Sequence, residues 1–414
     1  MGTRCPEARG VAFFICDGAM ERRVSTGHPE LVAAIASEIA DSGPIPFVRF
    51  MELALYHPQF GYYMRAPESG QERIGWQGDF YTSSDVHPIL GKALAKQAEQ
   101  MHRLLGQPDP FTVIEMGPGK GLLARHFLSA CERHFSLFFP RLRYVLIDRS
   151  PAMREIQRRN LAPWLDRPNV VTWVENLGQL APQRVTGLFL SNELVDSFPV
   201  HRVHVTATGI RELGVDYRDG RFVECLLPLS SAKLAPYVRP LSAEWPEGYR
   251  TEINLQASDW ITQIAGCVDR GFVITIDYGH TAQDLYRPDR KDGTFLCYWR
   301  HQANTDPFTR VGEQDMTAHV DFSNLAVAGE DHGLHMTGFT NQMSFLMGLG
   351  VEQLLQELEQ DSREFKAAIH LLKPNGMGTT FKTLIQHKGI EKPGLDGLKY
   401  KAFFRSALTA PFAA

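Results

Sequence analysis

The segment that decides the fold is Thr112-Val113-Ile114-Glu115-Met116-Gly117-Pro118-Gly119-Lys120-Gly121. It predicts a short buried strand that ends near an acidic residue and enters a glycine turn, from which a helix begins. Glycine lets the backbone turn tightly and lets a ligand approach without a Cβ atom in its way. A dinucleotide site has the spacing G-x-G-x-x-G, which would need glycine at position 122, where this chain has Leu122. The turn therefore disfavours a pyrophosphate ligand.

S-adenosylmethionine suits this turn better, because it has no pyrophosphate and carries positive charge on its sulfonium and its amino group. The carboxyl group of Glu115, near the end of the strand, matches that charge. The next predicted strand, residues 144–147, ends on Asp148, and a carboxylate there can accept hydrogen bonds from both ribose hydroxyls. Two simpler interpretations stay open: the glycines only join a strand to a helix, and Asp148 only caps the helix that starts at Pro151.

Short apolar strands alternate with helices around this turn. Strands that are apolar on both faces and alternate with helices indicate a parallel sheet covered by helices on each side, so we expect a Rossmann-like α/β core. The predicted strands are residues 112–116, 144–147, 170–174, 188–191 and 272–276, and the helices between them are residues 122–135, 151–160 and 255–268.

The remaining elements surround this core. Ser83 and Ser84 are candidate N-caps for a helix from about Pro88 to Leu105. Residues 200–227 have the pattern of two strands joined by the hairpin turn Arg218-Asp219-Gly220, which predicts an antiparallel insertion. The other predicted elements are helices at residues 29–40, 47–55, 341–349, 351–359 and 363–372 and a last strand at residues 381–386.

These elements divide the chain into five expected segments. They are an irregular N-terminal extension (1–28), an N-terminal helical segment (29–110), the first part of the cofactor-binding core (111–199), an antiparallel insertion (200–254) and the rest of the core with C-terminal helices (255–414).

The fourth predicted strand of the core runs directly into an acidic loop, Ser191-Asn192-Glu193-Leu194-Val195-Asp196. In a doubly wound sheet the carboxyl ends of the strands face the ligand crevice, where buried carboxylates need a cationic partner. A substrate guanidinium would be one, because a carboxylate that grips it in bidentate fashion orients the attacking nitrogen without a metal. The alternative is that Asn192 and Glu193 cap a short helix and pair with Arg202.

Composition sets further limits. The 414 residues carry a formal net charge of −4, which gives no electrostatic signature for nucleic acid. No apolar run approaches the roughly 20 residues that span a bilayer. The six cysteines never form a C-x-x-C pair, so we expect neither a zinc site nor a disulfide framework. Residues 1–19 show no periodicity, and either an upstream mis-assigned start or a mitochondrial transit peptide would explain them.

Further motifs extend from about Pro46 to Ile385. They are residues 50–58 with 61–63, 78–83, 115–121, 148–151, 191–201, 276–280, 317–322 and 377–378 with 381–382. In this order they resemble the MidA-type family, whose eukaryotic member is a mitochondrial complex I assembly factor that methylates an arginine of a complex I subunit. Ser84 departs from this pattern, since the family usually has proline there.

The resemblance implies a seven-stranded class I methyltransferase core with S-adenosylmethionine as the cofactor. It implies that Asp79 and Thr82 close over the amino-acid end of the cofactor. The candidate cofactor-binding residues are Asp79, Thr82, Glu115, Gly117, Gly119, Gly121, Asp148 and Asn192. The candidate catalytic residues are Glu193 and Asp196, and no metal is expected.

The acidic loop also resembles the first half of the acidic loop in symmetric-type protein arginine methyltransferases. The second acid of that loop lies further along in those enzymes, whereas nine residues after Glu193 this chain has Arg202. Asp196 is therefore the candidate for the second acid. His319 and Asp321 are a candidate polar pair near the site, or else a structural histidine and a helix cap.

We therefore predict an S-adenosylmethionine-dependent methyltransferase that acts on an arginine of a partner protein, by the resemblance a respiratory complex I subunit or an assembly-related protein. The alternative is a methyltransferase-like binding or assembly factor with little or no activity, and Leu122 disfavours a nicotinamide oxidoreductase. We expect no nucleic-acid partner, no membrane span, and a location in the cytoplasm of a bacterium or the mitochondrial matrix of a eukaryote. The sequence leaves open whether the protein forms a homodimer.

Overall fold

The computed structural model describes residues 27–65, 73–75, 78–168, 170–180, 184–241, 245–402, 404 and 408. The irregular extension predicted for residues 1–28 lies outside these ranges, apart from its last two residues. In the part of the chain that is described, no helix combines the length and the apolar character needed to cross a membrane.

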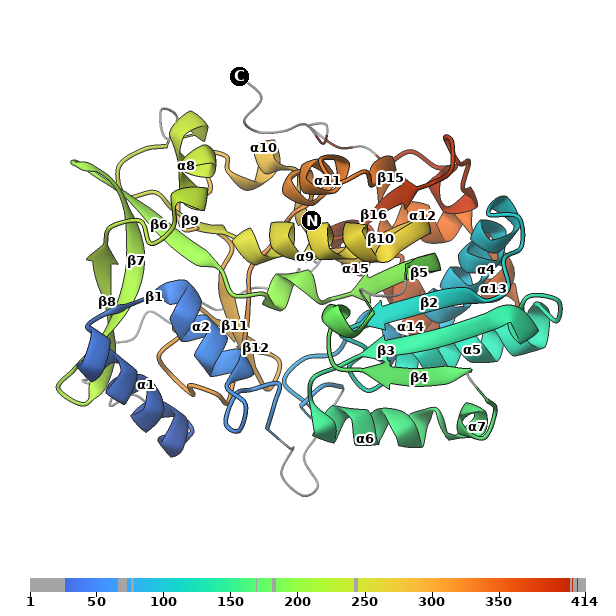
Figure 1. The fold of residues 1–414 in the computed structure, drawn as a ribbon, viewed down its shortest axis with the longest axis horizontal. Helices are drawn as coiled ribbons and strands as arrows, with labels where there is room; N and C mark the ends of the chain where they lie inside the picture. Colours follow the sequence, from blue (N-terminus) through green and yellow to red (C-terminus); the bar gives the residue numbers. More distant parts are fainter. Residues whose placement is uncertain are drawn as a thin grey trace, which may run out of the picture.

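The centre of the fold is a mixed sheet whose strands follow the order β4-β3-β2-β5-β10-β16-β15 (Figure 1). The first five run parallel to their neighbours, whereas β16 is antiparallel to both β10 and β15. A further short strand, β14 (Val320–Asp321), pairs with the end of β10. The strands are β2 (Phe111–Met116), β3 (Leu142–Ile147), β4 (Val171–Val174), β5 (Val185–Asn192), β10 (Val268–His280), β15 (His335–Asn341) and β16 (Phe381–Lys388).

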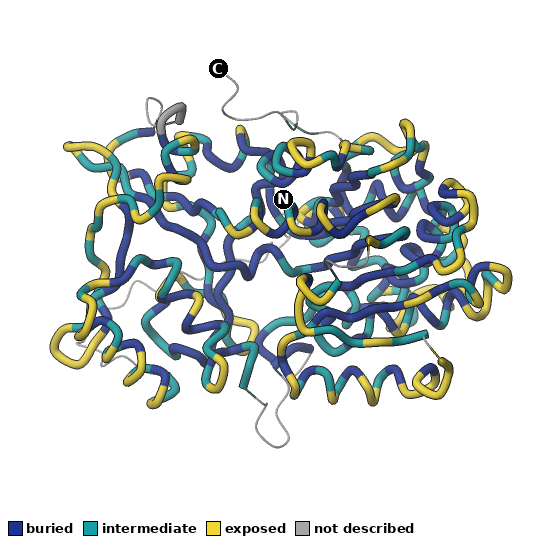
Figure 2. Tube along the Cα trace, viewed as in Figure 1, coloured by how far each residue is buried: buried dark blue, intermediate teal, exposed yellow. Residues whose placement is uncertain are grey.

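Helices cover both faces of this sheet, as the apolar strands predict. Helices α4 (Ile89–Leu104) and α5 (Leu122–His134) pack on one face, and α9 (Leu255–Cys267) and α11 (Phe322–Glu330) pack on the other. Figure 2 shows the strands buried between the two layers of helices, whereas α6 (Pro151–Asn160) has several exposed residues. The predicted parallel α/β core is therefore present in the structure.

A second lobe lies beside the core, on the left in Figure 1. We use this name for residues 29–56, 201–253 and 296–317, which form one antiparallel sheet of the order β1-β7-β6-β9 with β8 on β7, a small sheet β12-β11-β13, and helices α1 and α2. Its elements are α1 (Pro29–Ser42), β1 (Ile45–Pro46), α2 (Phe47–Tyr56), β6 (His201–Thr206), β7 (Gly209–Arg218), β8 (Arg221–Leu227), β9 (Arg250–Ile253), β11 (Leu296–Trp299), β12 (Gln302–Asn304) and β13 (Asp315–Thr317). Apolar side chains from all three segments pack together, so the lobe has its own core.

The remaining elements connect and flank these two parts. They are α3 (Ser83–Val86), the short 3-10 turn η3 (Val195–Ser197), α8 (Ala235–Leu241), α10 (Ala282–Leu285), α12 (Gln342–Gly348), α13 (Val351–Gln356), α14 (Arg363–His370) and α15 (Met377–Thr380).

The helix predicted from about Pro88 to Leu105 is present as α4, but its predicted N-caps are wrong. Ser83 and Ser84 do not cap the helix that leads to Leu104, because they form the separate short helix α3, and α4 begins only at Ile89 after Pro88. The backbone N–H of Thr82 donates to the Asp85 carboxylate at 3.0 Å, which fixes the start of α3. The consequence for the site is that the chain crosses the carboxyl edge of the sheet before it enters α4.

Candidate active site

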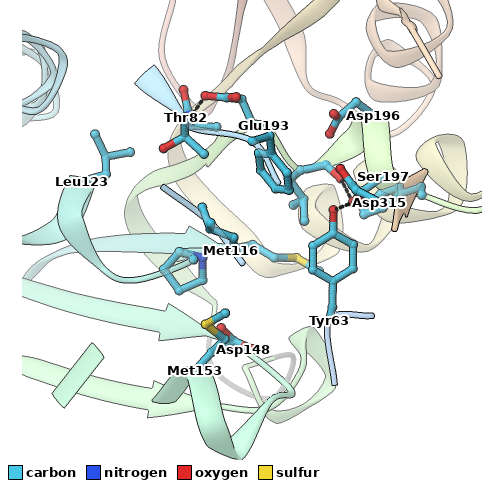
Figure 3. A pocket seen from close by; sticks show the side chains of 18 of the residues that line it. Tyr63, Thr82, Met116, Leu123, Asp148, Met153, Glu193, Asp196, Ser197 and Asp315 are labelled. Carbon is cyan, nitrogen blue, oxygen red and sulfur yellow. Dashed lines mark hydrogen bonds between the residues drawn. The ribbon is translucent and has the colours of Figure 1, made fainter. Parts of the chain in front are cut away.

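A cavity of about 1030 Å³ lies at the carboxyl ends of β2, β3 and β5, where the core meets the second lobe (Figure 3). Parallel α/β sheets bind their ligands at this edge. The cavity is lined by residues of the glycine turn, of the segment 79–85 that leads into α3 (the α3 region), of the acidic loop and of β13. It therefore joins the two motifs that the sequence singled out, and it adds a wall from the second lobe.

The glycine turn forms one wall of the cavity. Gly117, Gly119 and Gly121 have φ angles of 70°, 51° and 76°, a region that side chains with a Cβ rarely adopt. Gly117 and Gly119 line the cavity. Gly121 lies behind the wall, where it is the N-cap of α5 and faces Gln157. Its contact with the cofactor stays a prediction. In the structure, Gly121 allows the backbone to turn into α5.

Substituting Gly117 by alanine should destabilise the fold more than the same change at Gly119. Both residues have positive φ, which costs roughly 1–2 kcal/mol for an L-residue, but a Cβ on Gly117 would lie 2.7 Å from Cδ1 of Leu194, whereas at Gly119 the nearest atom is 3.9 Å away. Urea unfolding of the two variants would measure the difference. Equal losses in the free energy of unfolding would contradict a packing role for this glycine against the acidic loop.

Asp148 follows β3 directly and lines the cavity. Its Oδ1 accepts a hydrogen bond from the N–H of Ser150 at 2.8 Å, and its Oδ2 accepts one from Nε2 of Gln157 at 2.6 Å. Burial raises the pKa of this carboxyl above its ordinary value. The alternative that Asp148 only caps the following helix is wrong, because the cap of α6 is Ser150, whose hydroxyl accepts from the N–H of Met153.

Glu115 lies on β2 beside the turn and is 2% exposed. Its Oε2 accepts a hydrogen bond from the hydroxyl of Tyr144 at 2.7 Å, and burial raises its pKa to about 7. Glu115 lines the cavity together with Glu175, Asn176 and Leu177, which follow β4. The sequence did not single out these last three residues, although their position after a core strand was the available signal.

The α3 region forms the part of the cavity wall next to the glycine turn. The Asp79 carboxylate accepts hydrogen bonds from the hydroxyl of Tyr62 and the N–H of Arg300, each at 2.9 Å, so it ties this region to the second lobe. Thr82 lines the cavity one residue before α3. An ion pair of 2.6 Å between Asp85 and Lys120 links α3 to the glycine turn. The expected contacts of Asp79 and Thr82 with the cofactor remain predictions.

Glu193 is held in an unusual backbone conformation, with φ of 53°. A non-glycine residue in this region is strained by roughly 1–3 kcal/mol, and such strain gathers at functional sites. Its Oε1 accepts hydrogen bonds from the N–H of Ser83 at 2.9 Å and from Nδ2 of Asn192 at 3.0 Å. Its Oε2 has no hydrogen-bond partner among the described residues, and burial raises the pKa of the carboxyl to about 8.

The helix-cap alternative for this loop is wrong. The turn η3 has Leu194 as its N-cap, without a capping side chain. Arg202 does not pair with Glu193, because its guanidinium lies 3.5 Å from the carboxylate of Glu252 in the second lobe and over the ring of Phe295. Asn192 is also buried, and its Oδ1 has no hydrogen-bond partner in the described chain.

A buried carboxylate on β10 holds the acidic loop in place. Oδ2 of Asp277 accepts from the N–H groups of Leu194, Val195 and Asp196 at 3.2, 2.9 and 3.3 Å. The hydroxyl of the next residue, Tyr278, donates to Oδ2 of Asp196. Asp277 and Tyr278 belong to the motif at residues 276–280, but the sequence assigned them no role. An acid at the end of an apolar strand was the available signal.

Two further residues of the cavity wall come from the segment 315–319, which joins the second lobe to β14 of the core sheet. Asp315, on β13, is 3% exposed, accepts a hydrogen bond from the hydroxyl of Tyr63 at 2.6 Å, and has its pKa raised by burial to about 7. His319 lines the cavity, but its ring partner is Nε2 of His280 at 3.1 Å. The suggested pair of His319 with Asp321 does not form, because Asp321 is the N-cap of α11.

The cavity is strongly acidic. Among the described residues that line it, eight have carboxyl side chains and two, Lys120 and Arg149, have a lysine or arginine side chain. The acids are Asp79, Asp85, Glu115, Asp148, Glu175, Glu193, Asp196 and Asp315. Within the described ranges, no group of three or more His, Cys, Asp or Glu side chains is arranged to hold a metal ion. The arrangement suits organic cations.

The buried acids predict that the ligand-free protein loses stability as the pH rises from about 6.5 to 8. Burial raises the pKa of Glu193 to about 8 and that of Asp315 and Glu115 to about 7. In this range the folded protein keeps protons that the unfolded chain has released, so the free energy of unfolding falls as the pH rises. Buried histidines act in the opposite sense but at lower pH, since burial lowers the pKa of His126 and His319 to about 4.

Calorimetric melting at several pH values would measure this effect. We expect the melting temperature to fall between pH 6.5 and 8. It should fall less in Glu193→Gln, because this variant has no titrating carboxyl at position 193. A melting temperature that is constant or rises over this range would show that these carboxyls are ionised at little cost in the folded protein.

The fold and the cavity together define a methyltransferase that uses S-adenosyl-L-methionine. The chain is similar to the crystal structure of a Burkholderia thailandensis protein bound to S-adenosyl-homocysteine, with 32% sequence identity and a TM-score of 0.80 over 90% of this chain and 95% of that one. Residues 93–340 match the model of a family described as "Putative S-adenosyl-L-methionine-dependent methyltransferase". The chain belongs to this family.

Curated relatives match over nearly the whole chain. The mitochondrial protein arginine methyltransferase NDUFAF7 homolog of Drosophila melanogaster is 27% identical over 413 residues, which cover 90% of this chain and 88% of the relative. The mitochondrial protein arginine methyltransferase NDUFAF7 of Homo sapiens is 24% identical, with 94% of this chain and 92% of the relative covered. The predicted resemblance to the MidA-type family is confirmed, as are the class of enzyme and its cofactor.

Proposed function

We propose that this protein methylates an arginine side chain of a partner protein. The observation that carries the proposal is the Glu193 carboxylate, which Ser83 and Asn192 fix through one oxygen. Its other oxygen has no partner among the described residues and belongs to a side chain that lines an acidic cavity. A guanidinium is planar, always charged and binds a carboxylate through two parallel hydrogen bonds. The printed names of the curated relatives, protein arginine methyltransferases, support the same substrate class.

The central sheet supports assignment as the seven-stranded class I methyltransferase core, since its main path has seven strands with one antiparallel strand, β16, near the edge. We propose that the core comprises residues 111–199 and 255–414, from which residues 296–317 leave to join the second lobe. In this proposal residues 29–110 form an N-terminal helical segment, and residues 200–254 form an insertion. The insertion then offers a surface for the substrate protein or for a second copy of the chain, which sedimentation with and without substrate would distinguish.

The residues at the sheet edge fit S-adenosylmethionine. We assign Asp148 to the ribose hydroxyls, because its carboxylate stands at the end of β3 in the cavity wall, and the backbone of Gly117 and Gly119 to the amino-acid end, with Asp79, Thr82, Glu115 and Asn192 around it. Gly121 shapes the turn. When bound, the cofactor supplies an electrophilic methyl group on its sulfonium. The carboxyls of the acidic loop are on the side of the cavity away from Asp148 in Figure 3.

Glu193 and Asp196 have two tasks in this proposal. They orient the guanidinium, which removes the entropic cost of alignment from the reaction itself. They also accept the proton that a guanidinium must lose when its nitrogen is methylated. Burial suits them to this task, because it raises the pKa of Glu193 to about 8 and that of Asp196 to about 6, and a proton acceptor with a pKa near neutrality is effective at neutral pH.

The partner protein and location follow from the relatives. The resemblance to the MidA-type family supports a subunit or assembly-related protein of respiratory complex I as the partner. A nucleic-acid partner is not proposed, because the net charge of −4 gives no electrostatic signature for one. For a eukaryotic source the proposed location is the mitochondrial matrix, which the mitochondrial relatives support. For a bacterial source the proposed location is the cytoplasm. The competing proposal is a binding or assembly factor with little activity, which the complete set of Glu115, Asp148 and Glu193 in one cavity disfavours.

Transfer of label from S-adenosylmethionine with a tritiated methyl group would test this function. Three peptide libraries, identical except for a fixed central arginine, lysine or citrulline, would be incubated with the protein and the products hydrolysed. We expect methylarginine from the arginine library alone. Label on lysine would contradict the substrate class. Bound cofactor without label on any library or on protein from a cell extract would favour the assembly factor.

A further inference from the structure

We propose that Asp315 of the second lobe and Asp196 of the acidic loop together form a second carboxylate site for the substrate guanidinium. With Glu193, three carboxylates then bind the arginine, two from the core and one from β13. This inference rests on the proposed arginine specificity, because it names the residues that would recognise the guanidinium.

Strand β13 lies directly against the acidic loop. The N–H of Ala318, just after β13, donates to the carbonyl oxygen of Asp196 at 2.9 Å. Asp315 is opposite Tyr298 in the β11–β13 ladder, and both residues line the cavity together with Asp196. Figure 3 shows the side chains of Asp196 and Asp315 at the same end of the cavity. The second lobe therefore brings a carboxylate to the loop that carries the other two.

Each of the three carboxylates is anchored through one oxygen only. Oε1 of Glu193 accepts from Ser83 and Asn192, and Oδ1 of Asp315 accepts from the hydroxyl of Tyr63 and from its neighbouring backbone. Oδ2 of Asp196 accepts from a tyrosine hydroxyl. Among the described residues, the second oxygen of each carboxylate has no hydrogen-bond partner. Three acids that line one cavity thus each keep one oxygen without a partner in the described chain, and that of Asp196 is buried in the wall.

The free oxygen of Asp196 indicates that a cation belongs here. Asp196 is 6% exposed, and its Oδ1 is buried without a partner in the described chain. Such an atom costs free energy until it finds a donor. The two cationic side chains in the cavity wall are engaged elsewhere: Lys120 pairs with Asp85 at 2.6 Å, and Arg149 lies over the ring of Tyr56. A cationic group of a ligand would satisfy the free oxygens.

Tyrosine rings explain why this cation would be a guanidinium. Tyr63, Tyr278 and Tyr298 line the cavity beside the acids, and the first two donate their hydroxyls to Asp315 and Asp196. A guanidinium stacks on aromatic rings and presents five N–H donors in one plane, whereas an ammonium is a compact point charge with three donors. Three carboxylates next to aromatic rings match the planar group better than lysine.

Direct binding of a small guanidinium probe would test the site. Nα-acetyl-arginine N-methylamide would be titrated into the full-length protein in the presence of S-adenosyl-homocysteine, with the lysine and citrulline analogues as controls. Asp315→Asn and Asp196→Asn keep the size of each side chain and an oxygen to accept the tyrosine hydroxyl. Asp259→Asn is the matched control, because Asp259 is 57% exposed and lies outside the cavity.

We expect wild type and Asp259→Asn to bind the arginine probe, and each cavity variant to bind it about 10- to 100-fold more weakly, with the affinity for S-adenosyl-homocysteine within about twofold of wild type as proof of an intact fold. Full affinity in Asp315→Asn, with wild type still selective for arginine, would overturn the role of Asp315 and leave the proposed function standing. If wild type binds the citrulline or lysine probe as well as the arginine probe, the arginine specificity itself fails.

Discussion

Replacing Glu193 by alanine is expected to lower methyl transfer by about 10²- to 10³-fold, the usual loss when one oriented polar group is removed from an active site, while S-adenosylmethionine still binds. The reason is that we assign the substrate and the cofactor to different residues of the cavity. Glu193 belongs to the acidic loop, whereas Asp148 and the glycine turn form the opposite wall (Figure 3). The measurement pairs turnover, by release of S-adenosyl-homocysteine, with calorimetric titration of the cofactor.

Glu193→Gln separates the charge from the structural role of this side chain. The amide oxygen can still accept the hydrogen bond from Ser83 that holds α3, but it carries no charge to grip a cation. We expect turnover to fall nearly as far as in the alanine variant, with α3 undisturbed. Unchanged turnover in either variant would rule out the guanidinium-binding role of Glu193.

The second large effect is expected at Asp148, where alanine should weaken S-adenosylmethionine binding about 10- to 100-fold, as for lost hydrogen bonds to a charged group. At saturating cofactor, turnover should stay close to that of wild type, because Asp148 is remote from the acidic loop in Figure 3. The same calorimetric titration gives the affinity, and the rate at high cofactor concentration gives the turnover.

A control is needed because Asp148 also binds Ser150 and Gln157. Asp148→Asn keeps one oxygen for the backbone of Ser150 and removes the charge, so its affinity for the cofactor should lie between those of wild type and the alanine variant. An affinity equal to wild type in both variants would mean that the ribose is bound elsewhere and that this carboxylate serves only the turn before α6.

The parts of the site that lie on the core could be predicted because each is local in sequence. An apolar run followed by Gly117 and Gly119 specifies a strand and a tight turn, and Asp148 and Glu193 each follow directly on such a run. The parallel sheet then brings the ends of separate strands to one edge. Once β2, β3 and β5 are assigned, the common cavity of these residues follows without further information.

The contribution of the second lobe could not be predicted, since it depends on contacts between distant segments. Asp315 lies on a strand of three residues between turns, where no periodicity can develop, and only the packing of β13 against η3 brings it to Asp196. The predicted role of Ser83 as the N-cap of α4 is wrong for a related reason. Its type is a good helix cap, but the neighbouring Asp85 and the distant Glu193 stabilise a separate short helix instead.

The central claim is that the cavity at the end of the sheet binds S-adenosylmethionine. Calorimetric titration of the purified protein with S-adenosylmethionine, with NAD as the control ligand, tests it most directly. We predict binding of S-adenosylmethionine in the micromolar range, about −8 kcal/mol, and no binding of NAD, because Leu122 stands where a pyrophosphate site has glycine. Binding of NAD, or no heat with either ligand, would contradict it.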